Sequence, residues 1–332
     1  MAESEVSTAA RGMPAVSVMI PVLNEADHLV AAVKSALDQD YSGEIEVILA
    51  LGPSRDGTDS IAHRLSEEDP RVRIVANPSG RTAAALNAAI EASRFDFLVR
   101  LDGHSEIDRD YIRTAIETLL KVGAVNVGGI MAAEGISRFQ VAVARAMRSV
   151  LGVGNSRFHT GGEAGESDTV YLGVFKKSAL AQIGGFDERF TRAQDWELNY
   201  RLRAKGGKVW FDPRLQVTYR PRKNLGLLAK QYFEYGRWRR AVSRRHIGTV
   251  NFRYLAPPTA VAINLLSIVL AWTAAPLFIA PLLGYLALIA IGSLVIGKSW
   301  SERILLPVII TTMHMSWGMG FLTSPKGLVS GE

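Results

Sequence analysis

The sequence predicts an α/β domain with a mixed, mainly parallel sheet and helices on both faces, followed by helices in a membrane. Two patterns carry this prediction. In the first half of the chain, short apolar runs alternate with helical segments of roughly 10–13 residues, which is typical of βαβ units around a parallel sheet. Near the C-terminus, 42 residues (256–297) and then 22 residues (304–325) contain no Asp, Glu, Lys or Arg. A membrane helix needs about 20 apolar residues.

The elements are expected in regular order along the chain. Strands are predicted at 16–22, 45–51, 72–76, 95–101, 124–131, 169–175 and 208–211. Helices are predicted at 26–38, 57–68, 81–93, 110–121, 138–150, 194–205 and 225–245, and 152–167 is predicted to be a loop. Ligands of such sheets bind at the carboxyl ends of the strands, which here are the segments 21–25, 52–56, 77–81 and 102–104.

The apolar C-terminal part predicts two or three membrane spans. Two spans, at about 258–277 and 280–297, fit the first stretch, which is interrupted by prolines and a glycine. The segment 304–322 is long enough for a third span, although it contains His314 and several glycines, so a re-entrant course stays open. If it spans, the C-terminus is expected outside.

Charge is concentrated directly before the first apolar stretch. The chain carries 38 Lys and Arg against 32 Asp and Glu, and nine of the basic residues lie between Arg220 and Arg245. Basic residues beside a span favour the cytoplasmic side and attract anionic lipid, so membrane lipid is the expected partner and nucleic acid is not. The N-terminal segment has no apolar core typical of a signal peptide, so the first domain is expected in the cytoplasm. The chain has no cysteine, which excludes disulfides and thiolate metal sites.

Two side chains at the predicted end of the fourth strand suit a metal ion. Arg100-Leu101-Asp102-Gly103-His104 places Asp102 and His104 two residues apart. A carboxylate and an imidazole suit Mn²⁺ or Mg²⁺, with substrate phosphates filling other positions. Taken alone, an Asp-Gly at a strand end is more often simply a turn.

Three further motifs lie where a strand ends or a helix begins. Pro21-Val22-Leu23-Asn24-Glu25 and Asn77-Pro78-Ser79-Gly80-Arg81 each precede a helix, whose free N–H groups can bind an anion, and Arg81 adds a cation. Helix capping or a structural turn is the plainer interpretation of both. Asp195, in Gln194-Asp195-Trp196-Glu197, is either an N-terminal cap or a general base that deprotonates an attacking hydroxyl.

Taken together, these motifs resemble family 2 glycosyltransferases with the GT-A fold. The resemblance covers about residues 16–240 and rests on order and spacing. It is carried by PVLNE (21–25), RDGT (55–58), NPSGRTAAALNAAI (77–90), RLDGH (100–104), GGFDE to QDWE (184–197) and YGRW (235–238). The apolar C-terminal extension resembles membrane-bound members that build bacterial exopolysaccharide, of the succinoglycan-biosynthesis type.

The resemblance implies roles for particular residues. Asp102 and His104 match the metal motif, with His104 in place of the more common second Asp, and Asp195 matches the catalytic base. Pro21, Asn24, Glu25, Asp56, Arg81 and Asp102 are expected to bind the donor. Arg237 and Trp238 match a Gln-x-x-Arg-Trp motif on the acceptor side, with Glu234 where Gln is expected. Leu51-Gly52 replaces the acidic pair that binds the nucleotide base, so the base is not predicted.

These observations predict the domain organisation and the activity. The expected parts are a tail (1–14), a GT-A domain (15–222), a basic interfacial region (223–255) and a membrane region (256–325). The expected function is an inverting, metal-dependent transfer of sugar from a nucleotide-diphosphate sugar to a lipid-linked saccharide, in a multi-pass protein of the cell membrane. Two alternatives stay open: transfer to polyprenyl phosphate itself, and an inactive membrane-anchored subunit for sugar-nucleotide binding or transport.

Overall fold

A mixed sheet organises the first half of the chain. The computed structural model describes residues 12–329, and across them the strands follow the order β3-β2-β1-β4-β7-β5-β8-β6. The strands β1 (Val16–Val22), β2 (Ile45–Leu51), β3 (Val72–Ala76) and β4 (Phe97–Arg100) are parallel. β7 (Tyr171–Lys176) is antiparallel to both β4 and β5 (Asn126–Ala133), and β8 (Val209–Tyr219) is antiparallel to β6 (Gly165–Glu166). The predicted mainly parallel α/β sheet is therefore confirmed.

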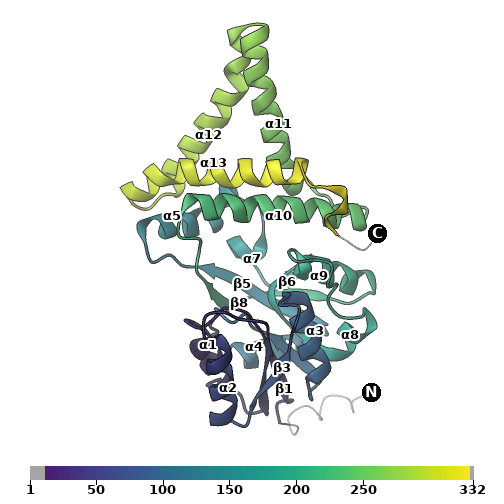
Figure 1. The fold of residues 1–332 in the computed structure, drawn as a ribbon. Helices are drawn as coiled ribbons and strands as arrows, with labels where there is room; N and C mark the ends of the chain where they lie inside the picture. Colours follow the sequence, from purple (N-terminus) through teal and green to yellow (C-terminus); the bar gives the residue numbers. More distant parts are fainter. Residues whose placement is uncertain (1–11, 330–332) are drawn as a thin grey trace, which may run out of the picture. The chain divides into compact units, whose positions relative to one another are not determined.

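Chain contacts divide the protein into two units. Unit 1 contains the residues up to 131 together with 162–218, and unit 2 contains 132–161 together with the chain from 219 onward. Figure 1 shows the fold. Segment 132–161 thus belongs to the same unit as the C-terminal helices, although it lies between two segments of unit 1 in the sequence.

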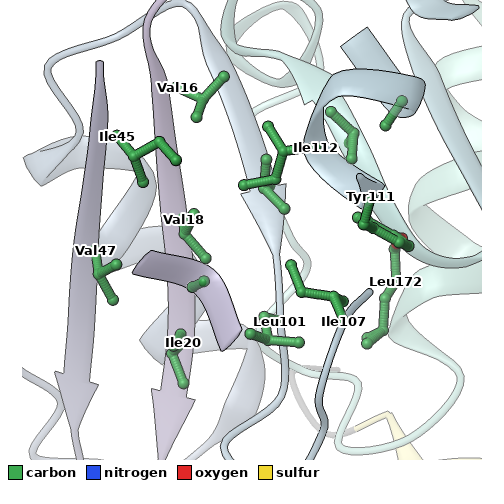
Figure 2. Packing of buried hydrophobic residues seen from close by; sticks show 14 of the residues in the cluster. Val16, Val18, Ile20, Ile45, Val47, Leu101, Ile107, Tyr111, Ile112 and Leu172 are labelled. Atoms are coloured by element: carbon green, nitrogen blue, oxygen red, sulfur yellow. The ribbon is translucent and has the colours of Figure 1, made fainter. Parts of the chain in front are cut away.

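Helices cover both faces of the sheet in unit 1. The even-numbered residues of β1, from Val16 to Val22, pack with α1 (Leu29–Leu37), α2 (Thr58–Glu68) and α4 (Tyr111–Val122). Figure 2 shows part of this cluster, with Ile112 and Tyr111 facing the strands. Met19 points to the opposite face, where α3 (Thr82–Ala92), α8 (Lys177–Gln182) and α9 (Gln194–Ala204) supply the apolar side chains. This alternation follows from the two-residue period of a strand.

One predicted strand is longer than expected. The strand predicted at 208–211 continues as β8 to Tyr219. The Asp212-Pro213-Arg214 sequence suggests a turn, but Asp212 is buried and accepts hydrogen bonds from Thr118 (2.9 Å) and Arg214 (2.7 Å). β6 pairs with Trp210 and Phe211, so Pro213 lies beyond that pairing. The predicted loop at 152–167 likewise contains the short α7 (Arg157–Thr160) and β6.

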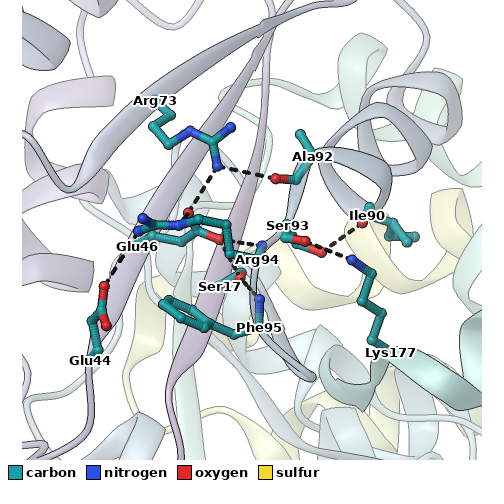
Figure 3. Close-up of polar contacts among 10 residues, drawn as sticks. All are labelled: Ser17, Glu44, Glu46, Arg73, Ile90, Ala92, Ser93, Arg94, Phe95 and Lys177. Carbon is teal, nitrogen blue, oxygen red and sulfur yellow. Dashed lines mark hydrogen bonds and ion pairs between the residues drawn. The ribbon is translucent and has the colours of Figure 1, made fainter.

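A buried carboxylate holds together the amino ends of the parallel strands. The side chain of Glu46, in β2, is fully buried and accepts hydrogen bonds from Ser17 Oγ (2.7 Å), the backbone N–H of Arg94 (2.7 Å) and two guanidinium groups. These are Arg94 Nε at 2.7 Å and Arg73 Nη1 at 3.1 Å (Figure 3). Burial alone would raise the pKa of Glu46, but the hydrogen bonds outweigh it and the pKa is lowered. We call these four residues the Glu46 cluster.

Unit 2 consists mainly of helices. They are α5 (Arg138–Met147), α6 (Val150–Val153), α7, α10 (Leu225–Arg245), α11 (Phe252–Thr273), α12 (Ala280–Ile296) and α13 (Trp300–Leu322). Short 3₁₀ turns lie at Pro276–Ile279 and Lys326–Leu328. Three helical segments are long and apolar enough to cross a membrane: Phe252–Thr273, Pro276–Ile296 and Trp300–Leu322.

Candidate active site

The loops that follow β1, β2 and β3 lie against one another at the carboxyl edge of the sheet. A Cβ atom added to Gly52 would lie 3.2 Å from the carbonyl oxygen of Val22 and 3.3 Å from the Cα atom of Gly80. A side chain here would crowd both neighbours, so glycine suits this close approach. The segments that the sequence singled out as strand ends are therefore neighbours in space.

Hydrogen bonds connect the first two of these loops. Asn24 adopts a left-handed backbone (φ 55°), and its Oδ1 accepts the N–H of Arg55 at 2.9 Å. The Asp56 carboxylate accepts the N–H of Ala26 (3.2 Å) and the hydroxyl of Thr58 (2.5 Å). The Thr58 hydroxyl is the main cause of the lowered pKa of Asp56. Both oxygens of Asp56 thus hold the loop in place.

The loop after β4 joins this group through His104. Its Nδ1 lies 2.7 Å from Oε1 of Glu25, whose side chain is mostly buried, whereas the imidazole is about half exposed. Gly103 allows this contact, because a Cβ atom there would lie 3.0 Å from Cγ of Glu25. The structure therefore brings together Glu25 and His104, which the sequence assigned separately to donor and metal.

Arg100 contacts both Asp102, the predicted metal ligand, and Asp195, the predicted base. Its side chain is almost fully buried at the end of β4, and its Nε and Nη2 donate to Oδ1 of Asp102 at 3.2 and 3.1 Å. Its Nη1 donates to Oδ1 of Asp195. Side-chain exposure is 19% for Asp102 and 33% for Asp195, so each carboxylate keeps access from solvent.

The start of α9 presents Asp195 toward β4. Ala193, the residue before the helix, has a left-handed backbone (φ 59°), an unfavourable conformation for a residue other than glycine. Strained backbone that the surrounding structure maintains is often found at active sites. The cap position belongs to Ala193 and the Asp195 carboxylate contacts Arg100, so the capping interpretation does not describe this side chain.

The charges of this group shift the pKa of its members. Burial raises the pKa of Asp195, and the neighbouring Asp102 raises it further, while Arg100 opposes both. Burial alone would lower the pKa of Arg100, but the two carboxylates raise it overall. Arg100 therefore stays charged, and Asp195 accepts a proton more readily than an ordinary aspartate.

Within the part of the chain that the structure describes, protein side chains alone build no complete metal site. Among residues 12–329, no three His, Asp or Glu side chains lie close enough together to hold a metal ion. Asp102 and His104 lie in one tight turn, closed by a 2.9 Å hydrogen bond from the Ser105 N–H to the Asp102 carbonyl. They offer one carboxylate and one imidazole.

The last two predicted donor residues are Pro21 and Arg81. Pro21 is half-buried near the end of β1, where it lies beside Ala50 of β2. Arg81 is exposed at the start of α3, and its backbone N–H donates to Ser79 Oγ at 3.1 Å. Both lie at the carboxyl edge of the sheet.

The predicted acceptor residues lie on α10, in unit 2. Arg237 Nη1 donates to Oε1 of Glu234 at 3.0 Å, and both side chains are about one-quarter exposed. Trp238 is almost fully buried within its unit.

Sequence reasoning assigned no role to Arg100. The signal was present, because Arg100 is a single cation at the end of an apolar strand whose neighbours are buried. A buried cation requires a partner of opposite charge. The partner Asp195, 95 residues later, could not be identified without the fold.

Comparison with known proteins points to one family. The family model described as glycosyl transferase family 2 matches residues 17–180. The succinoglycan biosynthesis protein ExoA of Rhizobium meliloti is 33% identical over 92% of this chain and 93% of its own length. A second relative, from Methanococcus voltae, is 27% identical over 96% of this chain and 98% of its own length. It is described as a dolichyl N-acetyl-α-D-glucosaminyl phosphate 3-β-D-2,3-diacetamido-2,3-dideoxy-β-D-glucuronosyltransferase.

A solved structure has a similar fold. The mannosyltransferase PcManGT of Pyrobaculum calidifontis, in complex with GDP-Man and Mn²⁺, aligns with a TM-score of 0.59 and 18% identity. The alignment covers 94% of this chain and 87% of that one. The sheet, the converging loops and the near full-length relative together lead to one conclusion: this chain belongs to glycosyl transferase family 2.

Proposed function

We propose that this glycosyltransferase moves a sugar from a nucleotide-diphosphate sugar to a lipid-linked saccharide, with inversion at the anomeric carbon, in exopolysaccharide synthesis. The observation that carries the proposal is the contact of both Asp102 and Asp195 with Arg100 at the carboxyl edge of the sheet. This edge is where α/β sheets bind ligands. The near full-length similarity to ExoA supports the exopolysaccharide assignment.

Asp102 and His104 would hold a divalent cation, Mn²⁺ or Mg²⁺. The donor set fits, since oxygen and imidazole ligands suit these ions and diphosphate oxygens complete the shell. The Glu25 carboxylate at Nδ1 of His104 fits as well, because metal-binding imidazoles commonly donate their second ring N–H to a carboxylate. When bound, the cation would neutralise negative charge on the leaving diphosphate. The fold of PcManGT, described with Mn²⁺ and GDP-Man, is consistent with this assignment.

Asp195 would act as the general base. Its raised pKa improves it as a proton acceptor, and it contacts Nη1 of Arg100, whereas Asp102 contacts Nε and Nη2. The acceptor hydroxyl loses its proton to the carboxylate, and its oxygen forms a bond to the anomeric carbon. The bond from that carbon to the diphosphate oxygen breaks on the opposite side. One displacement of this kind inverts the configuration.

Arg100 would position both carboxylates, and the surrounding loops would bind the donor. A guanidinium offers donors in a rigid fork, so one side chain can orient two carboxylates. Pro21, Asn24, Glu25 and Arg81 line the strand-end loops, with Arg81 suited to a phosphate. Asp56 would act chiefly by holding the loop, because its oxygens are already engaged.

Glu234, Arg237 and Trp238 would serve the acceptor side from α10. Glu234 and Arg237 are the accessible pair, whereas Trp238 would support them from the interior of its unit. The acceptor class is supported by the name of the Methanococcus relative, which describes transfer to a sugar on dolichyl phosphate.

A donor screen tests the proposal. Membranes containing the full chain would be given single nucleotide sugars, Mn²⁺ and an extracted lipid-linked saccharide, and products would be followed by mass. The expected product is the acceptor plus one hexose-sized unit, absent from membranes with Asp195→Asn. Product formed on polyprenyl phosphate alone would replace the proposed acceptor. No product with any donor, from a protein that still binds nucleotide sugars, would favour an inactive binding subunit.

A further inference from the structure

Helix α13 lies alongside α10 within unit 2. A Cβ atom added to Gly236 of α10 would lie 2.0 Å from the carbonyl oxygen of Trp317, and one added to Gly320 would lie 2.0 Å from that of Phe233. Farther along, the guanidinium of Arg240 lies over the ring of Phe321. These close contacts place the two helices side by side (Figure 1).

Contacts at both ends keep α13 in this position. Near its start, Glu302 is buried and accepts Nε of Arg145, from α5, at 3.0 Å. Beyond its end, Ser324 Oγ donates to the carbonyl of Arg237 at 2.9 Å, and Arg244 donates to the carbonyls of Ser324 and Pro325, each at 2.9 Å. A helix that crossed the bilayer away from α10 would break these contacts.

The partner helix α10 cannot itself cross a membrane. Its 21 residues include six cations and one acid: Lys230, Glu234, Arg237, Arg239, Arg240, Arg244 and Arg245. Charged residues at the centre of a membrane span are strongly unfavourable. Since α13 runs beside α10 along its length, it shares this orientation.

One face of α13 is apolar and exposed. Trp300, Ile304, Val308, Met319 and Leu322 are exposed, whereas Glu302, Leu306, Ile309, Ile310 and Met313 are buried. The exposed positions, with Thr311 and Met315 between them, recur every three or four residues, which places them on one stripe of the helix. We call this the α13 stripe. Arg303 stacks over Trp300 at its start, an arrangement suited to the headgroup level.

The hairpin of α11 and α12 differs from α13 in its exposure. We compare the most apolar 18 residues of each segment. The buried share is 39% in α13, 22% in α11 and 11% in Pro276–Ile296. The exposed hairpin residues include Leu265, Leu266, Val269, Leu286, Leu288, Ile291 and Val295. At about 1.5 Å per residue, 21 or 22 residues match the thickness of the hydrocarbon core, about 30 Å.

We propose that α11 and α12 are the only two membrane spans among the described residues, and that α13 lies in the membrane plane. The α13 stripe would then rest on the acyl chains of the leaflet that faces the catalytic domain. Arg244, Arg245, Lys298 and Arg303 would lie among the headgroups of that leaflet. The chain after α13 returns to the side of the membrane that holds the catalytic domain.

Single cysteines test the number of spans, because the chain has no cysteine of its own. Glu67→Cys reports the catalytic domain, Ala274→Cys the hairpin tip, and Gly327→Cys the segment after α13, where an added Cβ meets open space. Inside-out vesicles treated with a membrane-impermeant maleimide should show labelling at 67 and 327 and none at 274. Intact cells without a wall should show the reverse. Labelling of 327 together with 274 would mean that α13 spans, and labelling of 274 together with 67 would mean that the hairpin does not cross.

The depth of α13 gives a second, independent measurement. Spin labels at Ile304→Cys, Val308→Cys and Met315→Cys, all on the α13 stripe, would be compared by power saturation in liposomes containing anionic lipid. An in-plane helix predicts one shared shallow depth, about 5–10 Å below the headgroups. A depth that changes by about 1.5 Å per residue along the series would overturn the proposal. Glu67→Cys is the water-exposed control, because Glu67 is exposed.

Discussion

Two arginine–carboxylate clusters lie at opposite ends of the same parallel strands, and they differ in how completely their carboxylates are satisfied. In the Glu46 cluster, one fully buried carboxylate receives hydrogen bonds from four donors, and its pKa is lowered. At the carboxyl edge, one guanidinium is shared by two partly exposed carboxylates, and the pKa of Asp195 is raised. Similar residues thus stabilise the fold at one end and retain capacity to bind at the other.

The largest expected effect is at Asp195. Asp195→Asn should lower turnover by about 10²–10⁴-fold, because general-base assistance is typically of that size. Donor affinity, measured by calorimetry, should change little. If the variant loses its thermal transition instead, Asp195 is a structural residue like Glu46, and the contrast between the two ends fails.

Asp102 should follow closely. Asp102→Asn should reduce turnover by at least about 10²-fold through lost stabilisation of charge on the leaving diphosphate, and EDTA should act likewise on the unmodified protein. Asp96→Asn is the matched control. Asp96 is exposed and directly precedes β4, at the end of the strand away from Asp102. Full activity in EDTA would exclude the metal assignment.

A smaller effect is expected from Arg100→Lys. The charge stays, but an ammonium cannot orient two carboxylates as a guanidinium does, so turnover should fall by about 10-fold or more. The hydrogen bond from Arg100 helps to lower the pKa of Asp195, so its loss in the lysine variant should raise that pKa further, and the base works only as the anion. As the pH is lowered, the variant should therefore lose activity at a higher pH than the unmodified protein does. Unchanged turnover together with an unchanged pH profile would leave Arg100 with a role in folding alone.

The Glu46 cluster should show the opposite behaviour, with a change in stability and none in chemistry. Glu46→Gln should lower the unfolding free energy by about 1–3 kcal/mol, the typical penalty for unsatisfied buried groups. Because the folded pKa is lowered, the contribution of Glu46 is present above the unfolded pKa, about 4.3, and is lost as pH falls below it. Unfolding of the full chain in detergent, followed across this pH range, should show the loss. Glu44→Gln, at an exposed pair with Arg94, should change little.

Much of the fold was predictable from local patterns. The ranges of β1, β2, β3 and α10 agree with the sequence prediction, because each is a continuous apolar or amphipathic run with polar residues at its ends. The extension of β8 was missed because Asp-Pro usually marks a turn, whereas here the buried Asp212 is satisfied by Thr118. Hydropathy indicates that α13 could span, but it carries no information about packing against α10.

The candidate site was predictable in its residues but not in its connections. The strand-end rule selects Asn24, Glu25, Asp102 and His104 without knowledge of the fold. The contacts between Glu25 and His104, and between Arg100 and Asp195, join segments 79 and 95 residues apart. Such pairs depend on strand order, and one sequence alone does not specify it.

The packing of α13 on α10 sets an order of events during biosynthesis. Helix α10 leaves the ribosome before the hairpin, and α13 is made after it. Until α13 emerges, the close-packing surface at Gly236 has no helix to cover it. On the proposed topology, the hairpin is synthesised before the helix that packs against it. Gly318 can pack on Pro257 of α11, and Gly320 on Phe233 of α10, only once α13 has been made. A large side chain at Gly320 would act as an assembly defect, leaving an inserted hairpin on an unfinished unit.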